Sequence, residues 1–214
     1  MLSWQKKDVP RWDLKRACGP SRLTALVSGA HIDDFVIACA NRQVLDGFCA
    51  RLLNAFEGTY EGALQHYLGC EVTRDKEKGT TYLSQTHYAE KFLRTYNFWN
   101  ATPRLTPMQP ITRLNKDDCD KNPAPDFYRR YRGIVSSRGC LVTMTSPDLA
   151  WAYSKLSKYV QFPGKNHKLA TKRVLCYLRG TWNQTISYSR DSHVNSNVLW
   201  GWVDADWAGD TNTR

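Results

Sequence analysis

The chain has 214 residues, of which 42% are hydrophobic and 12% are aromatic, and its formal net charge is +10. This composition excludes a purely disordered tail, because it supplies enough apolar side chains for one large or two small domains. The excess positive charge is spread along the chain and favours a polyanionic partner, nucleic acid ahead of an acidic membrane, although charge alone establishes neither.

Cysteine usage and the N-terminus indicate the compartment. The 7 cysteines are scattered without a C-x-x-C pair, and neither they nor the 5 histidines have the spacing of a zinc site. Several cysteines fall within apolar segments, which indicates reduced thiols in an intracellular protein, cytoplasmic or nuclear. The sequence has no apolar signal core and no stretch that could span a bilayer, so we predict no membrane partner.

The first part of the chain predicts a hairpin and a helix after a poorly ordered lead-in at residues 1–21. Two apolar runs, "LTALVSGA" and "FVIACA", flank "HIDD" and predict a β-hairpin with the carboxylates at or near its turn. The run "NRQVLDGFCARLLNAFEG" predicts a helix packed on this hairpin, with Asn41 as N-cap and Gly58 beyond its end. The apolar positions of that helix are Val44, Leu45, Phe48, Leu52 and Phe56.

The middle of the chain predicts a second hairpin, a second helix and a boundary. "HYLGCEVTRDKEKGTTYLSQ" is typical of two strands joined by a charged turn that contains glycine. "SQTHYAEKFLRTYNF" predicts a helix with Tyr88, Phe92, Leu93 and Tyr96 on its apolar face. Residues 101–126 hold 5 prolines and an acidic cluster, so we place a spacer and a domain boundary there.

The last part of the chain predicts three helices followed by two strands. Helical periodicity runs through "DFYRRYRGIVSSRGCLVTMT", "SPDLAWAYSKLSKYV" and "NHKLATKRVLCYLRG", and the strand-like runs "QTISYSR" and "NVLWGWVDADW" come after them. Ser146 is the expected N-cap of the second helix. Trp151 lies in an apolar helical run, so we predict that it packs in or beside the core and does not stack on bases.

Adjacent Asp33 and Asp34 at the tip of an apolar hairpin are candidate metal ligands. Two like charges in a partly desolvated turn repel each other, and a divalent cation removes that cost. Hard oxygen ligands suit Mg²⁺, which binds one or two protein carboxylates and completes its shell with phosphates and water. A solvated turn explains the same dipeptide, because aspartate is common in turns for backbone reasons.

Basic side chains in the last predicted helix form a candidate nucleic-acid surface. Lys165, Lys168, Lys172 and Arg179 fall roughly on one face, opposite Leu169, Val174 and Leu178, and the same segment contains His167 and Arg173. Such a face can neutralise the phosphates of a nucleic acid. It is equally typical of a solvated amphipathic helix, and the sequence does not separate the two interpretations.

Several blocks together resemble copia-type retrotransposon Pol polyproteins. "HIDDFVIACAN" resembles the Y-x-D-D motif of reverse transcriptases, and it is followed in the family's order by "HYLGCEVTRDKEKGTTYLSQTHYAEKFLRTYNF", "TPM", "YRRYRGIVSSRGCLVTMTSPDLAWAYSKLSKYVQFPGKNHKLATKRVLCYLRGT" and "GWVDADWAGDTNTR". The resemblance implies an α+β fold: reverse transcriptase palm and thumb over residues 22–100, the spacer over 101–126, a helical connection over 127–182, and the opening strands of an RNase H-like α/β domain over 183–214.

The resemblance also implies functional residues. Asp33 and Asp34 would bind catalytic Mg²⁺ in the palm for RNA-templated DNA synthesis, and Asp204 would be the first metal-binding carboxylate of RNase H. Tyr67, Leu68 and Gly69 match the palm hairpin that holds the primer end. Together with His31 and the basic residues of the last predicted helix, they are the expected nucleic-acid-binding residues; the basic residues are Lys165, Lys168, Lys172 and Arg173. The implied partners are an RNA/DNA template–primer and the remainder of the Pol polyprotein.

The sequence departs from the family pattern in ways that bear on activity. His31 stands where the family motif has tyrosine. The resemblance also implies a further carboxylate on an earlier palm strand. The carboxylates that precede Asp33 are Asp8 and Asp13, and both lie in a polar segment unlike the family's earlier motif. The chain ends at Arg214, ahead of the remaining RNase H carboxylates. We therefore expect little or no polymerase or RNase H activity from this chain by itself. The alternative is a non-catalytic retrotransposon remnant or a co-opted nucleic-acid-binding protein.

Overall fold

The structure is a computed structural model that describes residues 2–4, 26–32, 34–109, 112 and 114–189. The described part mixes helices with antiparallel strands, which confirms the α+β class predicted from the sequence. The chain divides into two compact units, unit 1 (Met1–Tyr67) and unit 2 (Leu68–Arg214). The finer division into palm, thumb, connection and RNase H stays a prediction.

Unit 1 is built on a four-stranded sheet with the strand order β2-β3-β1-β4. β2 and β3 form the predicted antiparallel hairpin, and β1 pairs antiparallel with both β3 and β4. The strands of unit 1, including the short β5 at its end, are β1 (Leu2–Trp4), β2 (Leu26–His31), β3 (Asp34–Cys39), β4 (Gly58–Tyr60) and β5 (His66–Tyr67).

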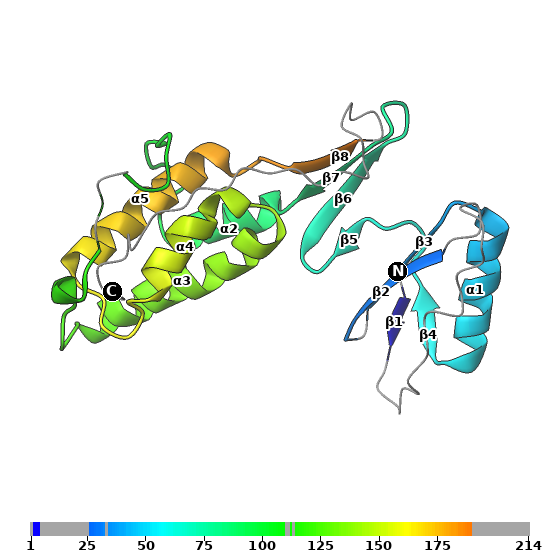
Figure 1. Ribbon diagram of the computed structural model, residues 1–214, viewed down its shortest axis with the longest axis horizontal. Helices are drawn as coiled ribbons and strands as arrows, with labels where there is room; N and C mark the ends of the chain where they lie inside the picture. Colours follow the sequence, from blue (N-terminus) through cyan, green and yellow to red (C-terminus); the bar gives the residue numbers. More distant parts are fainter. Residues whose placement is uncertain (1, 5–25, 33, 110–111, 113, 190–214) are drawn as a thin grey trace, which may run out of the picture. The chain divides into compact units, whose positions relative to one another are not determined.

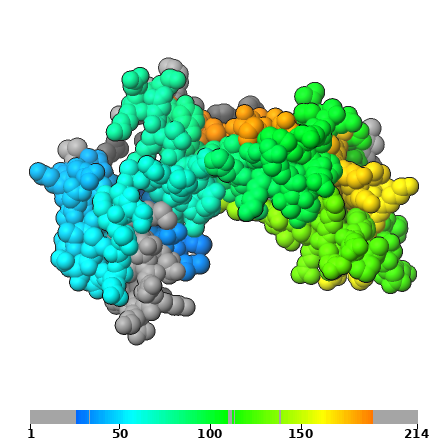
Figure 2. All heavy atoms as spheres, turned by 180° about the vertical axis from the view of Figure 1, so that it is seen from behind, coloured from blue at the N-terminus to red at the C-terminus, as the bar shows by residue number. Residues whose placement is uncertain are grey.

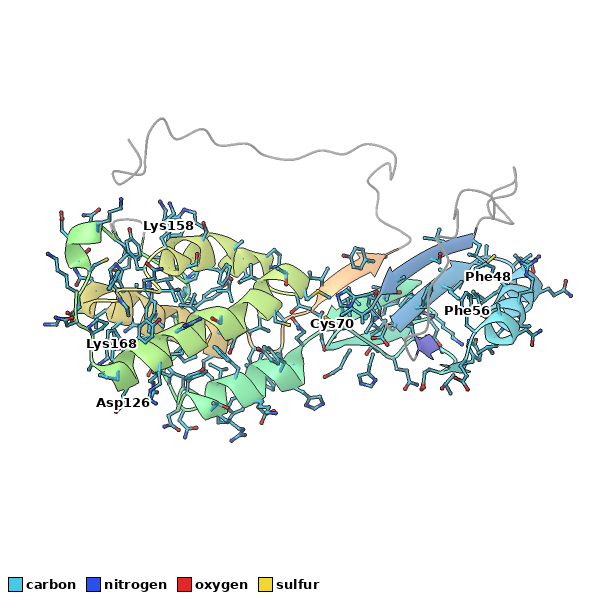
Figure 3. All side chains as sticks on the ribbon, turned by 90° about the horizontal axis from the view of Figure 1, so that it is seen from below. Phe48, Phe56, Cys70, Asp126, Lys158 and Lys168 are labelled. Atoms are coloured by element: carbon cyan, nitrogen blue, oxygen red, sulfur yellow. The ribbon has the colours of Figure 1, made fainter. Side chains whose placement is uncertain are left out.

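The predicted helix of unit 1 is α1 (Arg42–Ala55), which packs against β3 and β4 (Figure 1). The Asn41 side chain accepts hydrogen bonds from the backbone N–H groups of Gln43, at 2.9 Å, and Val44, at 3.4 Å, so the expected N-cap is confirmed. Its predicted apolar positions are half-buried, and Cys49 is buried. Figure 3 labels two of these positions, Phe48 and Phe56.

Unit 2 contains a second antiparallel sheet, in which β7 (Thr80–Ser84) lies between β6 (Cys70–Asp75) and β8 (Ile186–Ser189). The charged turn between β6 and β7 is stabilised locally, because the Lys78 N–H donates to Asp75 Oδ1 at 3.0 Å. That bond is the main reason why the pKa of Asp75 lies below its usual value. The pairing of β8 with β7 joins residues more than 100 positions apart, and no local pattern in the sequence predicts it.

Four α-helices of unit 2 lie side by side (Figure 1). Ser146 precedes the turn before α4 as predicted, but its side chain makes no capping hydrogen bond, because its ψ of 63° is not the extended geometry that capping requires. None of the helices in the described ranges has the length and apolarity needed to cross a membrane. The helices are α2 (Thr86–Thr95), α3 (Pro125–Met144), α4 (Ala150–Ser157) and α5 (Lys165–Thr181), with 3-10 turns at Lys116–Asp118 and Pro147–Leu149.

The core of unit 2 is formed by one face of each of these helices. Phe92 and Leu93 of α2 are buried as predicted, and the buried Tyr131 hydroxyl of α3 donates to the Leu156 carbonyl of α4 at 2.8 Å. The proline-containing segment after α2 also belongs to the core, because Met108 is buried in it and the Arg104 N–H donates to the Cys176 carbonyl of α5 at 3.2 Å. Figure 2 shows this segment, in green, at the surface of unit 2.

A close backbone approach fixes the start of α5. Gly164 is the N-cap residue and is buried, and the Asn166 side chain, in the first turn of the helix, donates to Asp118 Oδ1 at 2.5 Å. A Cβ atom at Gly164 would overlap the backbone carbonyl oxygen of Asp118. Only glycine therefore allows the turn at Lys116–Asp118 to contact the helix N-terminus this closely.

Replacement Gly164→Ala should lower the free energy of unfolding of unit 2 by about 1 to 3 kcal/mol, because the Asp118 backbone must move. The measurement is urea unfolding followed by circular dichroism. Gly47→Ala is the matched control: Gly47 lies within α1 and a Cβ there meets no atom within 4 Å, so alanine should stabilise unit 1 slightly. An unchanged unfolding midpoint for Gly164→Ala would contradict the contact.

Candidate functional site

The tip of the β2–β3 hairpin brings two of the predicted site residues together. His31 ends β2 and pairs with Asp34, which begins β3, so two residues connect the strands and Ile32 is the first of them. Ile32 has a φ of 51° and is 83% exposed. Asp33 itself lies outside the described residues. The predicted placement of the carboxylates at or near a hairpin turn is confirmed for Asp34.

Asp34 is held by backbone pairing on both sides of its strand. β3 lies between β2 and β1, and Asp34 has His31 as its partner on one side and Ser3 on the other. Its side chain is half-buried, whereas His31 is exposed. Strand pairing on both sides holds the backbone of Asp34 in place, and a metal ligand requires such a fixed position.

The donor chemistry of the hairpin suits Mg²⁺. Oxygen ligands from one or two carboxylates are what this ion takes from a protein when phosphates and water supply the rest, and Asp34 with its sequence neighbour Asp33 would provide that set. Within the part of the chain that the structure describes, no cluster of three or more histidine, cysteine, aspartate or glutamate side chains could hold a metal ion. Asp204, the predicted RNase H ligand, lies outside the described residues.

Tyr67, Leu68 and Gly69 form a tight turn at the boundary of the two units. Leu68 has a φ of 50° and Gly69 a φ of 77°, and two successive positive values are typical of a type I′ turn. Tyr67 and Leu68 are half-buried and Gly69 is exposed. Their predicted contact with a primer end stays a prediction.

The predicted basic residues of α5 divide into exposed and engaged groups. Lys165, Lys168 and Lys172 are exposed, and the Lys168 ammonium lies 5.2 Å from the centre of the Phe127 ring. Arg173 is half-buried and donates from its guanidinium to Thr106 Oγ1 at 2.8 Å, while its buried Nε has no hydrogen-bond partner among the described residues.

The predicted orientation of α5 is confirmed for two apolar residues and wrong for the third. Val174 and Leu178 are buried, but Leu169 is 54% exposed. Leu169 stands four residues after Lys165 and three before Lys172, which places it on the lysine face. Arg179 is engaged too, since its Nε donates to the Trp99 carbonyl and its guanidinium lies 4.5 Å from the Trp99 ring centre.

His167 is predicted to belong to the basic surface, and the structure corrects this prediction. The side chain is completely buried, its ring stacks on that of Tyr159 with centroids 4.1 Å apart, and Nδ1 accepts a hydrogen bond from the Gly164 N–H at 2.9 Å. Nε2 has no hydrogen-bond partner among the described residues. Burial lowers the pKa of His167, against the opposing effect of the Asp118 charge, so the folded protein favours the neutral ring.

Trp151 is a second correction. It was expected to pack in or beside the core, but its side chain is 52% exposed on α4, with the Lys155 ammonium 5.9 Å from the ring centre. The buried face of α4 is instead formed by Ala152 and Leu156. Lysines four and seven residues after Trp151 were the signal in the sequence that this face is exposed.

Residues 15–110 match the family model described as reverse transcriptase (RNA-dependent DNA polymerase). The chain is 29% identical over 86% of its length to the retrovirus-related Pol polyprotein from transposon TNT 1-94 of Nicotiana tabacum, and 35% identical over 85% to that from transposon RE2 of Arabidopsis thaliana. It spans 14% and 12% of the lengths of these two relatives.

A shorter relative is an uncharacterized mitochondrial protein of Arabidopsis thaliana, which is 26% identical over 86% of this chain and of which the chain covers 72%. No solved structure matches the chain.

The stability of unit 2 should fall as the pH drops below about 6.5, because the unfolded chain then binds a proton on His167 that the folded protein excludes. Above about pH 6.5 His167 is neutral in the unfolded chain as well, so it causes no loss of stability there. Between the two pKa values the slope from this residue approaches about 1.4 kcal/mol per pH unit.

His167→Gln should flatten this part of the pH profile, measured by urea unfolding between about pH 5 and 8. His87→Gln is the control, because His87 belongs to the same unit and its side chain is 86% exposed. Parallel profiles for the parent and His167→Gln would show that His167 is not the titrating group.

Proposed function

Since the chain belongs to the reverse transcriptase family of copia-type retrotransposon Pol polyproteins, we propose that it supplies the metal-binding hairpin of an RNA-directed DNA polymerase. The observation that carries this proposal is the β2–β3 register, which puts Asp34 at a two-residue turn on a strand that is paired on both sides. The hairpin in unit 1 would belong to the polymerase palm and α2 in unit 2 to the thumb.

Asp33 and Asp34 would hold Mg²⁺ at the hairpin tip. When bound, the ion supplies electrostatic stabilisation to the phosphates of the primer end and the incoming nucleotide. The two carboxylates balance its charge, and the strand pairing of Asp34 keeps the ligand in place. His31 pairs with Asp34 and is exposed, and by the family resemblance its imidazole would take the place of the tyrosine that positions nucleic acid.

The partners in this proposal are an RNA/DNA template–primer and the remainder of the Pol polyprotein. The charge of +10 supports a nucleic-acid partner, and the exposed Lys165, Lys168 and Lys172 are suited to phosphate contacts. Because the chain spans a small share of its Pol relatives, polymerase activity would require the rest of that protein. Asp204 would contribute likewise to an RNase H site.

A second candidate function is that of a non-catalytic retrotransposon remnant or co-opted nucleic-acid-binding protein. It is supported by the mitochondrial relative of which this chain covers 72%, since that protein is far shorter than the Pol polyproteins, of which the chain covers 14% and 12%. His31 in place of the family tyrosine supports it as well.

Primer extension on an RNA template distinguishes the two candidates. The chain alone should extend a primer little or not at all, whereas its fusion behind the preceding segment of the RE2 Pol polyprotein should extend it in a Mg²⁺-dependent way. Asp33→Asn and Asp34→Asn should each reduce extension by the fusion at least about a hundredfold, because a removed charge leaves the ion and phosphates unbalanced.

Asp46→Asn is the matched control for these variants. Asp46 is an exposed carboxylate in the same unit that pairs with Arg42 at 2.9 Å on α1, so its amide variant should extend as the parent does. Vigorous extension by the isolated chain would refute the need for the rest of the polyprotein. A fusion that binds template–primer but is inactive would favour the second candidate.

A further inference from the structure

One face of α4 is exposed and combines an aromatic ring with positive charge. Trp151, Ser154 and Lys158 are exposed and Lys155 is half-buried, and they stand at positions i, i+3, i+7 and i+4, which share one side of a helix. The other side is buried, since Ala152 and Leu156 are both 0% exposed. The orientation of α4 is therefore fixed by the core, and Trp151 is held outward.

The Trp151 ring is available to a flat ligand. A side chain with 52% exposure leaves a large part of the indole uncovered, and the Lys155 ammonium at 5.9 Å lies near the outer limit of a cation–π contact. Such a contact is weak, so a base can take its place over the ring. Lys158 extends the positive charge about 10 Å along the helix from Trp151.

The charge on this face is of one sign. α4 contains no acidic residue, and Asp148, in the turn before it, is engaged by a hydrogen bond with Tyr177 of α5. Figure 3 shows Lys158 at the outer edge of the helices of unit 2. A polyanion with exposed bases meets both requirements of this face, an aromatic platform and phosphate-neutralising lysines.

We propose that Trp151, Lys155 and Lys158 form a stacking site for single-stranded nucleic acid on α4. The proposal rests on the proposed function, because it names the form of nucleic acid that unit 2 would bind. A single strand is favoured over a duplex, since the bases of a duplex are stacked on each other and offer no face to the indole. The α5 face with Lys165, Lys168 and Lys172 has charge without an exposed aromatic ring of its own, so phosphate contact there would not discriminate between the two forms.

The test is fluorescence anisotropy of the full chain with labelled single-stranded RNA and DNA of about a dozen nucleotides, with the corresponding duplex, and with metal chelated throughout. Trp151→Ala should weaken single-strand binding about five- to a hundredfold without changing its salt dependence, while Trp151→Phe should keep most of the affinity. Lys155→Gln and Lys158→Gln should each reduce the slope of log affinity against log salt by about 0.7.

Leu105→Ala is the control variant, because Leu105 is a large apolar residue of the same unit that is 97% exposed and lies off α4. It should bind as the parent does, and thermal unfolding should show all variants folded. Comparison of the RNA and DNA strands shows which polymer the site takes.

The stacking site would be overturned if Trp151→Ala lost single-strand and duplex binding equally, or lost neither. Because the metal is chelated, the assay does not test the metal-binding hairpin, so either outcome leaves the proposed polymerase function standing. A parent chain that binds no oligonucleotide would overturn the stacking site directly. The proposed function is then judged separately by primer extension of the fusion.

Discussion

Burial of one face of α5 is the constraint on which the rest of unit 2 depends. Val174, Leu175 and Leu178 are excluded from solvent there, and α2, α3 and α4 each turn a face toward the same core. Because a helix turns about 100° per residue, fixing these side chains inside also fixes which residues lie outside. The outward position of the α5 lysines is therefore a consequence of apolar packing. The same reasoning applies to α4, where burial of Ala152 and Leu156 forces Trp151 outward.

The polar groups inside unit 2 are of two kinds. Gln85, at the start of α2, is buried with both ends satisfied, since it accepts from Thr145 Oγ1 at 2.8 Å and donates to Cys140 Sγ at 3.3 Å. His167 is satisfied at one nitrogen, and Thr171, one turn later on α5, also has a buried oxygen without a partner among the described residues. A buried polar atom without a partner costs free energy. α5 therefore carries the apolar contacts that stabilise unit 2 and also the buried, unpartnered polar atoms of His167 and Thr171, which lower its stability.

The sequence predicted those features that depend on local pattern. The β2–β3 hairpin, the Asn41 cap and the buried residues Phe92 and Leu93 follow from alternation, capping chemistry and helical spacing, which act over a few residues. The errors concern tertiary placement. Leu169 and Trp151 are large apolar side chains that the core does not use, and His167 is buried because Gly164 and Tyr159 close around it. Pairing of β8 with β7 is equally non-local. Of the candidate site, Asp34 and the exposed lysines could be located, and the lysines four and seven residues after Trp151 were the sequence signal for its outward position, which the apolar neighbours of Trp151 outweighed.

The two proposed sites depend on different physics, and this has a consequence for how such a chain evolves. The hairpin site depends on adjacent negative charges that need a metal ion and converging ligands, so it loses its chemistry when one ligand is lost. The α4 site depends on an exposed ring and on dispersed positive charge, where each contact contributes separately. Affinity for nucleic acid should therefore outlast catalysis when a Pol polyprotein decays into shorter proteins. The core that keeps Trp151 and the lysines outward lies within unit 2, whereas the carboxylates lie in unit 1. Selection for binding alone would then preserve the packing of α4 and α5 while leaving Asp33 and Asp34 free to change.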